Sequence, residues 1–236
     1  MTTDDTAQHE HEHHHEASSD EGHQHRHEPV DYADAVEAFR ADKDHYFRHG
    51  DRSPIPPLER EAFAGLAYFP VDEELRFDGR LLEAYDGSEP QRFQIPTSDG
   101  RLLPAHRAGS LRFELAGERR SLAAYVVDHP SGHVHTAETT EDPRAHEGPE
   151  APEEELPGLF VPFLDATSGH ETYGAGRYLD LEPEDDGTYT LDFNLAYHPS
   201  CVYDVRFSCP LTPAENRLPI RIEAGEQLPP GYDAAH

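Results

Sequence analysis

The stretch that decides the fold is LRFELAGERRSLAAYVV, residues 111–127. In its first half Leu111, Phe113 and Leu115 alternate with charged side chains, the pattern of a β-strand with one buried face. The dipeptide Ala116-Gly117 interrupts the alternation, and a second β-rich run, ERRSLAAYVV, follows it. The stretch therefore predicts two antiparallel strands joined by a tight turn.

Short apolar runs of the same kind continue on both sides of this hairpin. They lie at 74–80, 91–96, 159–164, 176–182, 188–193, 201–207 and 218–223. Turn-forming residues separate several of them, at Ser98-Asp99-Gly100, Thr167-Ser168-Gly169 and Asp185-Asp186-Gly187. Many short strands without intervening helical patterns predict a mainly β, single-domain antiparallel sandwich or barrel.

One segment before these strands has helical periodicity. It is DYADAVEAFRADKDHYFRHG, residues 31–50, with Asp31 as a plausible N-cap and Gly50 as a plausible end. Its apolar side chains fall near one face at 3.6-residue spacing: Tyr32, Ala35, Val36, Phe39, Tyr46 and Phe47. We expect an N-terminal helix that packs as a lid on the β-structure.

Two segments lack the apolar residues that a core requires. Residues 1–28 are rich in His and Glu, and we expect them to form a disordered arm because they cannot bury enough surface to offset ordering entropy. An acidic stretch at about 131–157 is predicted to be a long loop inserted between two strands. The expected organisation is the arm at 1–28, one domain at 29–228 and a tail at 229–236.

The charge balance is strongly acidic. The chain has 48 acidic and 19 basic residues, a formal charge of −29, and Lys43 is its one lysine. Concentrated salt would screen the resulting repulsion, so we interpret the composition as salt adaptation, the alternative being an ordinary acidic protein from a G+C-rich genome. Nucleic acid and anionic membranes are excluded as expected partners because the field has the wrong sign.

The chain carries no apolar run of 18 residues and no signal-peptide pattern at Met1–Asp20. Two cysteines are too few for a secreted disulfide scaffold. A cytoplasmic location is therefore expected.

Four long motifs resemble those of a known family. They are FAGLAYFPVDEELRF at 63–77, LFVPFLDATSGHETYGAGRYLDL at 159–181, LDFNLAYHPSC at 191–201 and CPLTPAENRLPIRIEAGE at 209–226. The chain resembles the bacterial and archaeal family called domain of unknown function 1684, over roughly 44–226. The resemblance implies a soluble mainly β domain and no established activity.

The arm offers one possible chemistry. Eight of the 18 histidines stand there beside glutamates: His9, His11, His13, His14, His15, His23, His25 and His27. Neutral imidazoles and carboxylates suit a divalent transition metal such as zinc, nickel or cobalt, so the arm could buffer or deliver such an ion. The alternative is a solvated, charge-rich tail.

The two cysteines form a second candidate. If the seven residues between Cys201 and Cys209 form a strand, its ends lie about 25 Å apart, whereas a disulfide needs Cα atoms within about 7 Å. Bonding therefore requires the segment to bend back. Reduced buried thiols, a redox pair and a partial metal site stay open.

The third candidate is a concentration of polar residues between apolar runs in the last third of the chain. They are Asp165, Thr167, Glu171, Tyr173, Arg177, Asp192, Asn194, Glu215 and Asn216. They could form a hydrogen-bond network that holds loops, with Arg177 clamping a carboxylate. They could instead line a site for a polar or anionic small molecule, with Glu171 or Glu215 as acid or base.

The sequence contains no phosphate-binding glycine loop, Gly-x-Ser-x-Gly elbow or His-Glu-x-x-His helix. Whether the protein is an enzyme, its oligomeric state and its ligand stay open. The leading hypothesis is a small polar-ligand-binding domain, with a site among Glu171, Arg177, Asn194 and Glu215. The alternative is a metal-binding accessory protein that acts through the arm.

Overall fold

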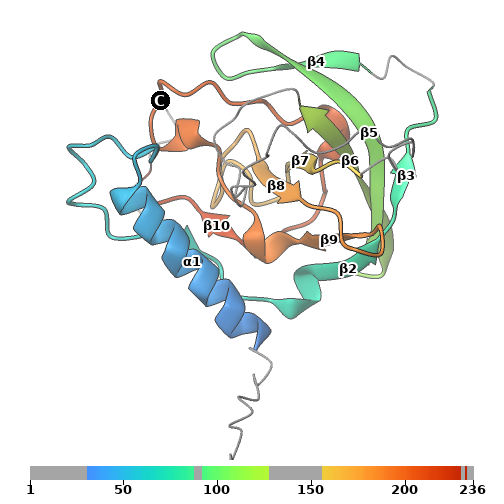
Figure 1. Ribbon diagram of the computed structural model, residues 1–236, viewed down its shortest axis with the longest axis horizontal. Helices are drawn as coiled ribbons and strands as arrows, with labels where there is room; N and C mark the ends of the chain where they lie inside the picture. Colours follow the sequence, from blue (N-terminus) through green and yellow to red (C-terminus); the bar gives the residue numbers. More distant parts are fainter. Residues whose placement is uncertain (1–30, 88–91, 128–155, 230–231, 233–236) are drawn as a thin grey trace, which may run out of the picture. The chain divides into compact units, whose positions relative to one another are not determined.

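The computed structural model of the protein describes residues 31–87, 92–127, 156–229 and 232 (Figure 1). These residues form one α-helix, ten strands and four short 3₁₀ helices. The predicted mainly β fold with one helix is therefore confirmed. The arm at 1–28 and all but the end of the acidic loop at 131–157 lie outside the described residues, so the predicted disorder of the arm and the predicted loop insertion stay predictions.

The largest sheet has six antiparallel strands in the order β3–β5–β6–β7–β8, with β4 also paired to β5. The bounds are β3 Leu82–Ala84, β4 Arg92–Pro96, β5 Leu102–Leu115, β6 Glu118–Val127, β7 Leu159–Phe163 and β8 Arg177–Leu181. β5 and β6 form the predicted hairpin, and Ala116 and Gly117 at its turn have φ of 55° and 72°. Two positive φ values match the twist of the strands, as in a type I′ turn.

β5 is long enough to hold two partners on the same edge. β4 pairs with its first half and β3 with its second half, and a bulge between Arg107 and Gly109 separates the two. A Cβ at Gly109 would lie 2.1 Å from the carbonyl oxygen of Glu83. Glycine at this position therefore allows β3 to approach β5.

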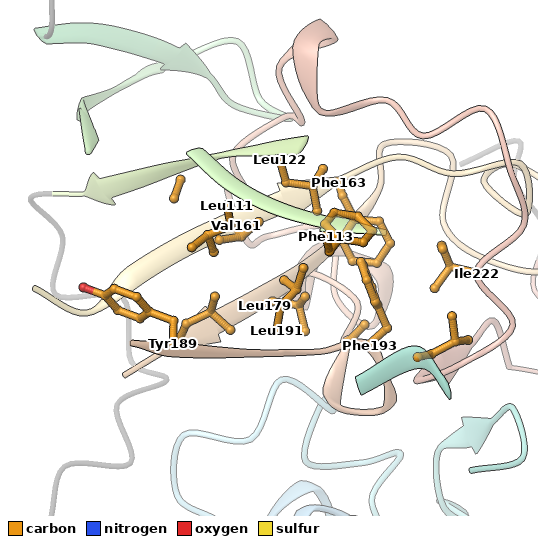
Figure 2. Close-up of a cluster of buried hydrophobic side chains, with 14 of the residues drawn as sticks. Leu111, Phe113, Leu122, Val161, Phe163, Leu179, Tyr189, Leu191, Phe193 and Ile222 are labelled. Carbon is orange, nitrogen blue, oxygen red and sulfur yellow. The ribbon is translucent and has the colours of Figure 1, made fainter. Parts of the chain in front are cut away.

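A second layer covers one face of this sheet. β2 (Arg76–Arg80) pairs with β9 (Tyr189–Asp192), and the side chains of Leu191 and Phe193 enter a cluster with those of the large sheet, which Figure 2 shows. The ring of Phe193 lies 5.1 Å from that of Phe163 and 5.7 Å from that of Phe113. The sheets do not close on themselves, so the sandwich is the observed form of the two predicted.

The predicted strand at 201–207 is wrong. Residues Ser200–Val202 form a 3₁₀ helix, and turns follow. Asp204 accepts hydrogen bonds from the backbone N and the Nε of Arg206, which closes a turn that a strand pattern does not reveal.

The predicted strand at 218–223 is also wrong. Pro219 cannot donate to a ladder, and the neighbouring backbone groups are bonded elsewhere. Leu218 N donates to Leu164 O, and Ile222 N donates to the Asp165 carboxylate. The segment is therefore held mainly by side chains and isolated bridges.

The predicted helix is confirmed as α1, Tyr32–His49. Asp31 accepts from Ala33 N at 2.9 Å, and Gly50 N donates to Tyr46 O at 2.7 Å. α1 lies beside β10 (Glu226–Gln227), which pairs with β1 (Ala67–Tyr68) (Figure 1). Among the described residues, no helix is long and apolar enough to cross a bilayer.

The buried face of α1 differs from the predicted one. Val36 and Phe47 are buried, Ala35 is exposed, and the charged Arg40 is buried between them. A helix that packed only through apolar side chains would not place a guanidinium there. α1 therefore packs on the rest of the protein partly through polar side chains.

Candidate functional site

The predicted polar residues at 165–167 form a local network. The carboxylate of Asp165 accepts from Thr167 N, Thr167 Oγ1, Ser168 Oγ and Ile222 N. Asp165 is 4 % exposed and Thr167 is fully buried. These contacts close the turn after β7 and attach it to residue 222.

Arg177 clamps backbone carbonyls of the C-terminal segment. Its Nη2 donates to Ile222 O at 2.8 Å, and its Nη1 donates to the carbonyls of Ala224 and Glu226. Asp165 Oδ1 lies 3.6 Å from Nη2, and the Arg177 side chain is fully buried. Burial lowers the pKa of Arg177 to about 10, yet the residue stays charged at neutral pH.

Two asparagines and Asp192 join neighbouring elements. Asn194 bonds both backbone groups of Asp72, and Asp192 accepts from Tyr32 Oη of α1 at 2.7 Å. Asn216 bonds the N and O of Ala123 in β6 and the carbonyl of residue 162 in β7. These amides replace missing ladder bonds between segments.

Glu171 and Glu215 lie in separate, partly exposed ion pairs. Glu171 pairs with Arg221 at 2.6 Å. Glu215 pairs with Arg107 and accepts from the hydroxyl of Tyr125. The proposed centre at residues 171, 177, 194 and 215 is thus divided among separate sets of partners, and ligand binding by these residues stays a prediction.

Tyr173 and the two cysteines do come together. The segment after Cys201 bends back, so that Cys209 Sγ lies 3.3 Å from Cys201 N and both thiols are free. Cys201 Sγ is 3.9 Å from Tyr173 Oη. The segment between the cysteines therefore bends back, as disulfide formation would require.

The described part of the chain contains no cluster of side chains that would support metal ligation. No group of three or more His, Cys, Asp or Glu side chains there is arranged to hold a metal ion. The eight histidines of the arm lie outside those residues, so metal binding through the arm stays a prediction.

Among the described residues, another group of buried charged and polar side chains lies beneath α1. We name it the Glu226 cluster; it consists of Arg40, Lys43, Tyr68, His198, Tyr203 and Glu226. α1 supplies the two cations, paired strands β1 and β10 supply Tyr68 and Glu226, and the loop after β9 supplies the other two residues. Because Tyr68 and Glu226 stand opposite each other in the pair, their side chains share a face.

Glu226 is the centre of the cluster. Its side chain is 1 % exposed, and Lys43 Nζ lies 2.6 Å from its Oε1 in an ion pair that lacks directed hydrogen-bond geometry. Its Oε2 accepts from His198 N at 2.7 Å and from Tyr203 Oη at 3.0 Å. Burial alone would raise the pKa of Glu226, but the Lys43 charge and the hydrogen bond from the His198 backbone N bring it below its usual value.

His198 is a neutral member of this cluster. Its Nε2 accepts from Tyr173 N at 3.2 Å, so its proton resides on Nδ1. Burial lowers the pKa of His198 to about 4, with Glu226 opposing the effect. Nδ1 lies 3.6 Å from Glu226 Oε2 and makes no hydrogen bond.

Arg40 and Tyr68 also carry polar atoms without partners. Arg40 donates from Nη1 to Glu37 at 2.9 Å, and its guanidinium carbon lies 4.6 Å from the centre of the Tyr68 ring. Arg40 Nε, Arg40 Nη2 and Tyr68 Oη are buried with no hydrogen-bond partner among the described residues. Burial raises the pKa of Tyr68 well above its usual value, so its hydroxyl keeps its proton.

No local sequence pattern indicates the Glu226 cluster, because its members are far apart in the chain. One signal was available: Lys43 is the only lysine among 236 residues. A chain that otherwise uses arginine for positive charge keeps its one ammonium where it faces a buried carboxylate.

Comparisons with known proteins agree on the family and leave the activity open. The family model described as "Protein of unknown function (DUF1684)" matches residues 61–227, a region that begins after α1. The chain is similar to an uncharacterised protein of Haloarcula marismortui solved by solution NMR, with 37 % identity and a TM-score of 0.54, over 82 % of this chain and 92 % of that one. No curated protein matches.

Proposed function

The chain belongs to the DUF1684 family of proteins of unknown function, and we propose that it binds a small acceptor-rich molecule, a carboxylate, at the Glu226 cluster beneath α1. The observation that carries the proposal is the unpaired edge of Arg40. Its Nε and Nη2 are buried and lack a hydrogen-bond partner in the described ranges. Folded proteins pair nearly all buried polar atoms, so such an edge calls for a partner.

The geometry of a guanidinium selects that partner. Nε–H and one Nη2–H point in parallel from the same edge, and a carboxylate accepts both through its two oxygens. Stacking on Tyr68 fixes the plane of the Arg40 guanidinium before a ligand arrives.

Two other groups of the cluster without a hydrogen-bond partner are also donors, whereas Glu226 Oε1 is an acceptor that lies 2.6 Å from the Lys43 ammonium. The hydroxyl of Tyr68 can donate, and His198 has its proton on Nδ1. Together with Arg40 they offer donors and no free anion, because the Glu226 carboxylate is already engaged by Lys43, His198 N and Tyr203. Such a set favours an anion or a molecule rich in oxygen acceptors over a cation.

α1 is the element through which a ligand would enter. Beside the buried Val36 and Phe47, α1 is held by polar links, including Tyr32 Oη with Asp192 and Asp44 Oδ1 with Leu66 N. Lys43 is 18 % exposed in its side chain, whereas Glu226 is 1 % exposed, so the pair lies at the border with solvent. Opening along α1 would therefore expose the donors without disrupting the apolar layers.

Thermal unfolding in the presence of small probes tests the proposal. Acetate, succinate and glutamate should raise the midpoint in a concentration-dependent manner at constant ionic strength, by about 2.7 kcal/mol of stability at 100 times the Kd. Acetamide, which has the shape of acetate without its charge, should have no effect.

Two variants make the test specific. Arg40→Lys keeps the charge and removes the forked edge, so it should abolish the response. Arg52→Lys changes an exposed arginine just after the same helix and should respond as the parent does. Equal stabilisation by acetamide, or an unchanged response in Arg40→Lys, would contradict the proposal.

A further inference from the structure

The two cysteines of the chain lie close together although seven residues separate them in the sequence. Cys201 lies in the 3₁₀ helix Ser200–Val202, and the turn closed by Asp204 and Arg206 reverses the chain after it. Cys209 is then fixed beside the end of β4, where Ser98 N donates to Cys209 O and Cys209 N donates to Ser98 Oγ. Hydrogen bonds to Ser98 and the turn after Cys201 thus hold the two cysteines near each other.

The two thiols have different surroundings. Cys209 is 6 % exposed, whereas Cys201 is partly exposed. Cys209 Sγ accepts a hydrogen bond from Cys201 N at 3.3 Å, and Cys201 Sγ lies 3.9 Å from Tyr173 Oη. Interaction with the Cys209 thiol is the largest cause that lowers the pKa of Cys201 to about 7, although burial opposes the change. Interaction with Cys201, together with burial, raises the pKa of Cys209.

We propose that Cys201 and Cys209 form a redox-active dithiol that reduces small disulfides, with Cys201 as the attacking thiol and Cys209 as the resolving thiol. The proposal does not depend on ligand binding at the Glu226 cluster. Its basis is the contact of Cys209 Sγ with the backbone N of Cys201, the partial exposure of Cys201 and the Tyr173 hydroxyl 3.9 Å from its sulfur.

The thiol–disulfide exchange proceeds in two steps. The Cys201 thiolate attacks one sulfur of a disulfide RS–SR, which forms a Cys201–SR bond and releases RS⁻. The Cys209 thiol then loses its proton and attacks Cys201 Sγ, which forms the Cys201–Cys209 bond and releases the second RS⁻. Both leaving thiolates take up protons, so the protein passes two electrons and two protons to the small disulfide.

A small disulfide suits this geometry. Cys201 is only partly exposed and is flanked by Tyr173, so a slender molecule reaches its sulfur more readily than a protein disulfide would. The closeness of Cys209 then favours resolution over persistence of the mixed disulfide, because the second attack is intramolecular.

Peptide mapping of the full-length protein tests the proposal. The reduced protein is incubated with bis(2-hydroxyethyl) disulfide, quenched with acid, alkylated and digested with trypsin. Trypsin cleaves after Arg206, between the cysteines, so a disulfide joins peptides 178–206 and 207–217. We expect this linked pair to accumulate as the main product, and two stable mixed disulfides or no reaction in the folded protein would overturn the proposal.

The order of attack is tested by alkylation and by single variants. In the folded protein iodoacetamide should label Cys201 at least about tenfold faster than Cys209, and the difference should vanish in denaturant. Cys209→Ser should trap a mixed disulfide on Cys201, whereas Cys201→Ser should stay unmodified. Equal labelling of both cysteines in the folded protein would overturn the assignment, and this result needs no variant to fold.

Discussion

The interior of this protein has two kinds of interface. Between the large sheet and the β2–β9 pair, fully buried Leu, Val, Phe and Tyr side chains interlock (Figure 2). Beneath α1, a lysine, an arginine, a histidine and a glutamate lie among tyrosines, and several of their polar atoms lack partners in the described structure. The first interface therefore specifies the fold, whereas the second keeps buried polar atoms without partners, which a stable fold alone does not require.

The largest effect is expected in the apolar interface. Phe193→Ala should destabilise the protein by about 3–5 kcal/mol, because the ring is fully buried against Phe77, Phe113 and Phe163. Leu195→Ala is the matched control from the same 3₁₀ helix, since Leu195 is 37 % exposed and should cost less than about 1 kcal/mol. Denaturant unfolding measures both, and equal costs would remove the contrast between core and surface.

The next largest loss of stability is expected at the polar interface beneath α1. Glu226→Gln should cost about 2–4 kcal/mol, because it leaves the Lys43 ammonium largely buried without a counter-ion. The double variant with Lys43→Met should recover part of this loss, because no unpaired charge then remains. The exposed pair Arg112–Glu83 is the control, and breaking it should change stability by less than about 1 kcal/mol.

A cost below that of the exposed pair would mean that the Lys43–Glu226 contact does not stabilise the fold. It would also weaken the view that α1 is anchored through charge.

How much of this contrast the sequence predicts depends on how far apart in the chain the contacting residues lie. The β5–β6 hairpin and the helix caps were predictable, because alternation, a turn dipeptide and Asp31 act within a few residues. The cluster beneath α1 was not, because positions 43, 198 and 226 meet only through long-range packing. The same limit explains residues 201–207, where the Asp204–Arg206 turn overrides an apolar pattern typical of a strand.

The predicted polar site illustrates a related limit. Its residues were identified by type, and the structure gives many of them partners in the backbone: Arg177 bonds three carbonyls and Asn216 bonds two segments. Residue type cannot distinguish a satisfied polar group from an unsatisfied one. That distinction exists only in three dimensions: both Nη atoms of Arg177 are bonded and its Nε is not, whereas Arg40 has neither Nε nor Nη2 bonded in the described structure.

The pH dependence of stability tests the buried imidazole. The pKa of His198 is about 4 in the folded protein and 6.5 in the unfolded chain, so above pH 6.5 neither state is protonated there and stability is complete. As pH falls from 6.5 towards 4, the unfolded chain takes up the proton first and stability is lost, by about 2 kcal/mol at pH 5. The pKa of Glu226 is lowered, so its contribution is lost only at more acidic pH.

His198→Gln is the control for this window. An amide oxygen can still accept from Tyr173 N, but the side chain no longer titrates. The difference in pH dependence between parent and variant, measured from pH 7 to pH 5, isolates His198 from the other histidines. Identical slopes would show that His198 titrates as an exposed residue does.

The smallest change in stability is expected from screening of the charged surface, and it distinguishes the surface from both interfaces. With a net charge of −29, the protein should gain on the order of 1 kcal/mol as KCl rises from about 0.1 M to 2 M, first by screening and then by strengthened apolar burial. The buried Lys43–Glu226 pair is shielded from salt, so Glu226→Gln should gain as much as its parent. Denaturant midpoints at several KCl concentrations give both curves. A flat parent curve would contradict salt adaptation, whereas parallel rising curves would place the salt response on the surface and leave the charge beneath α1 as part of the interior.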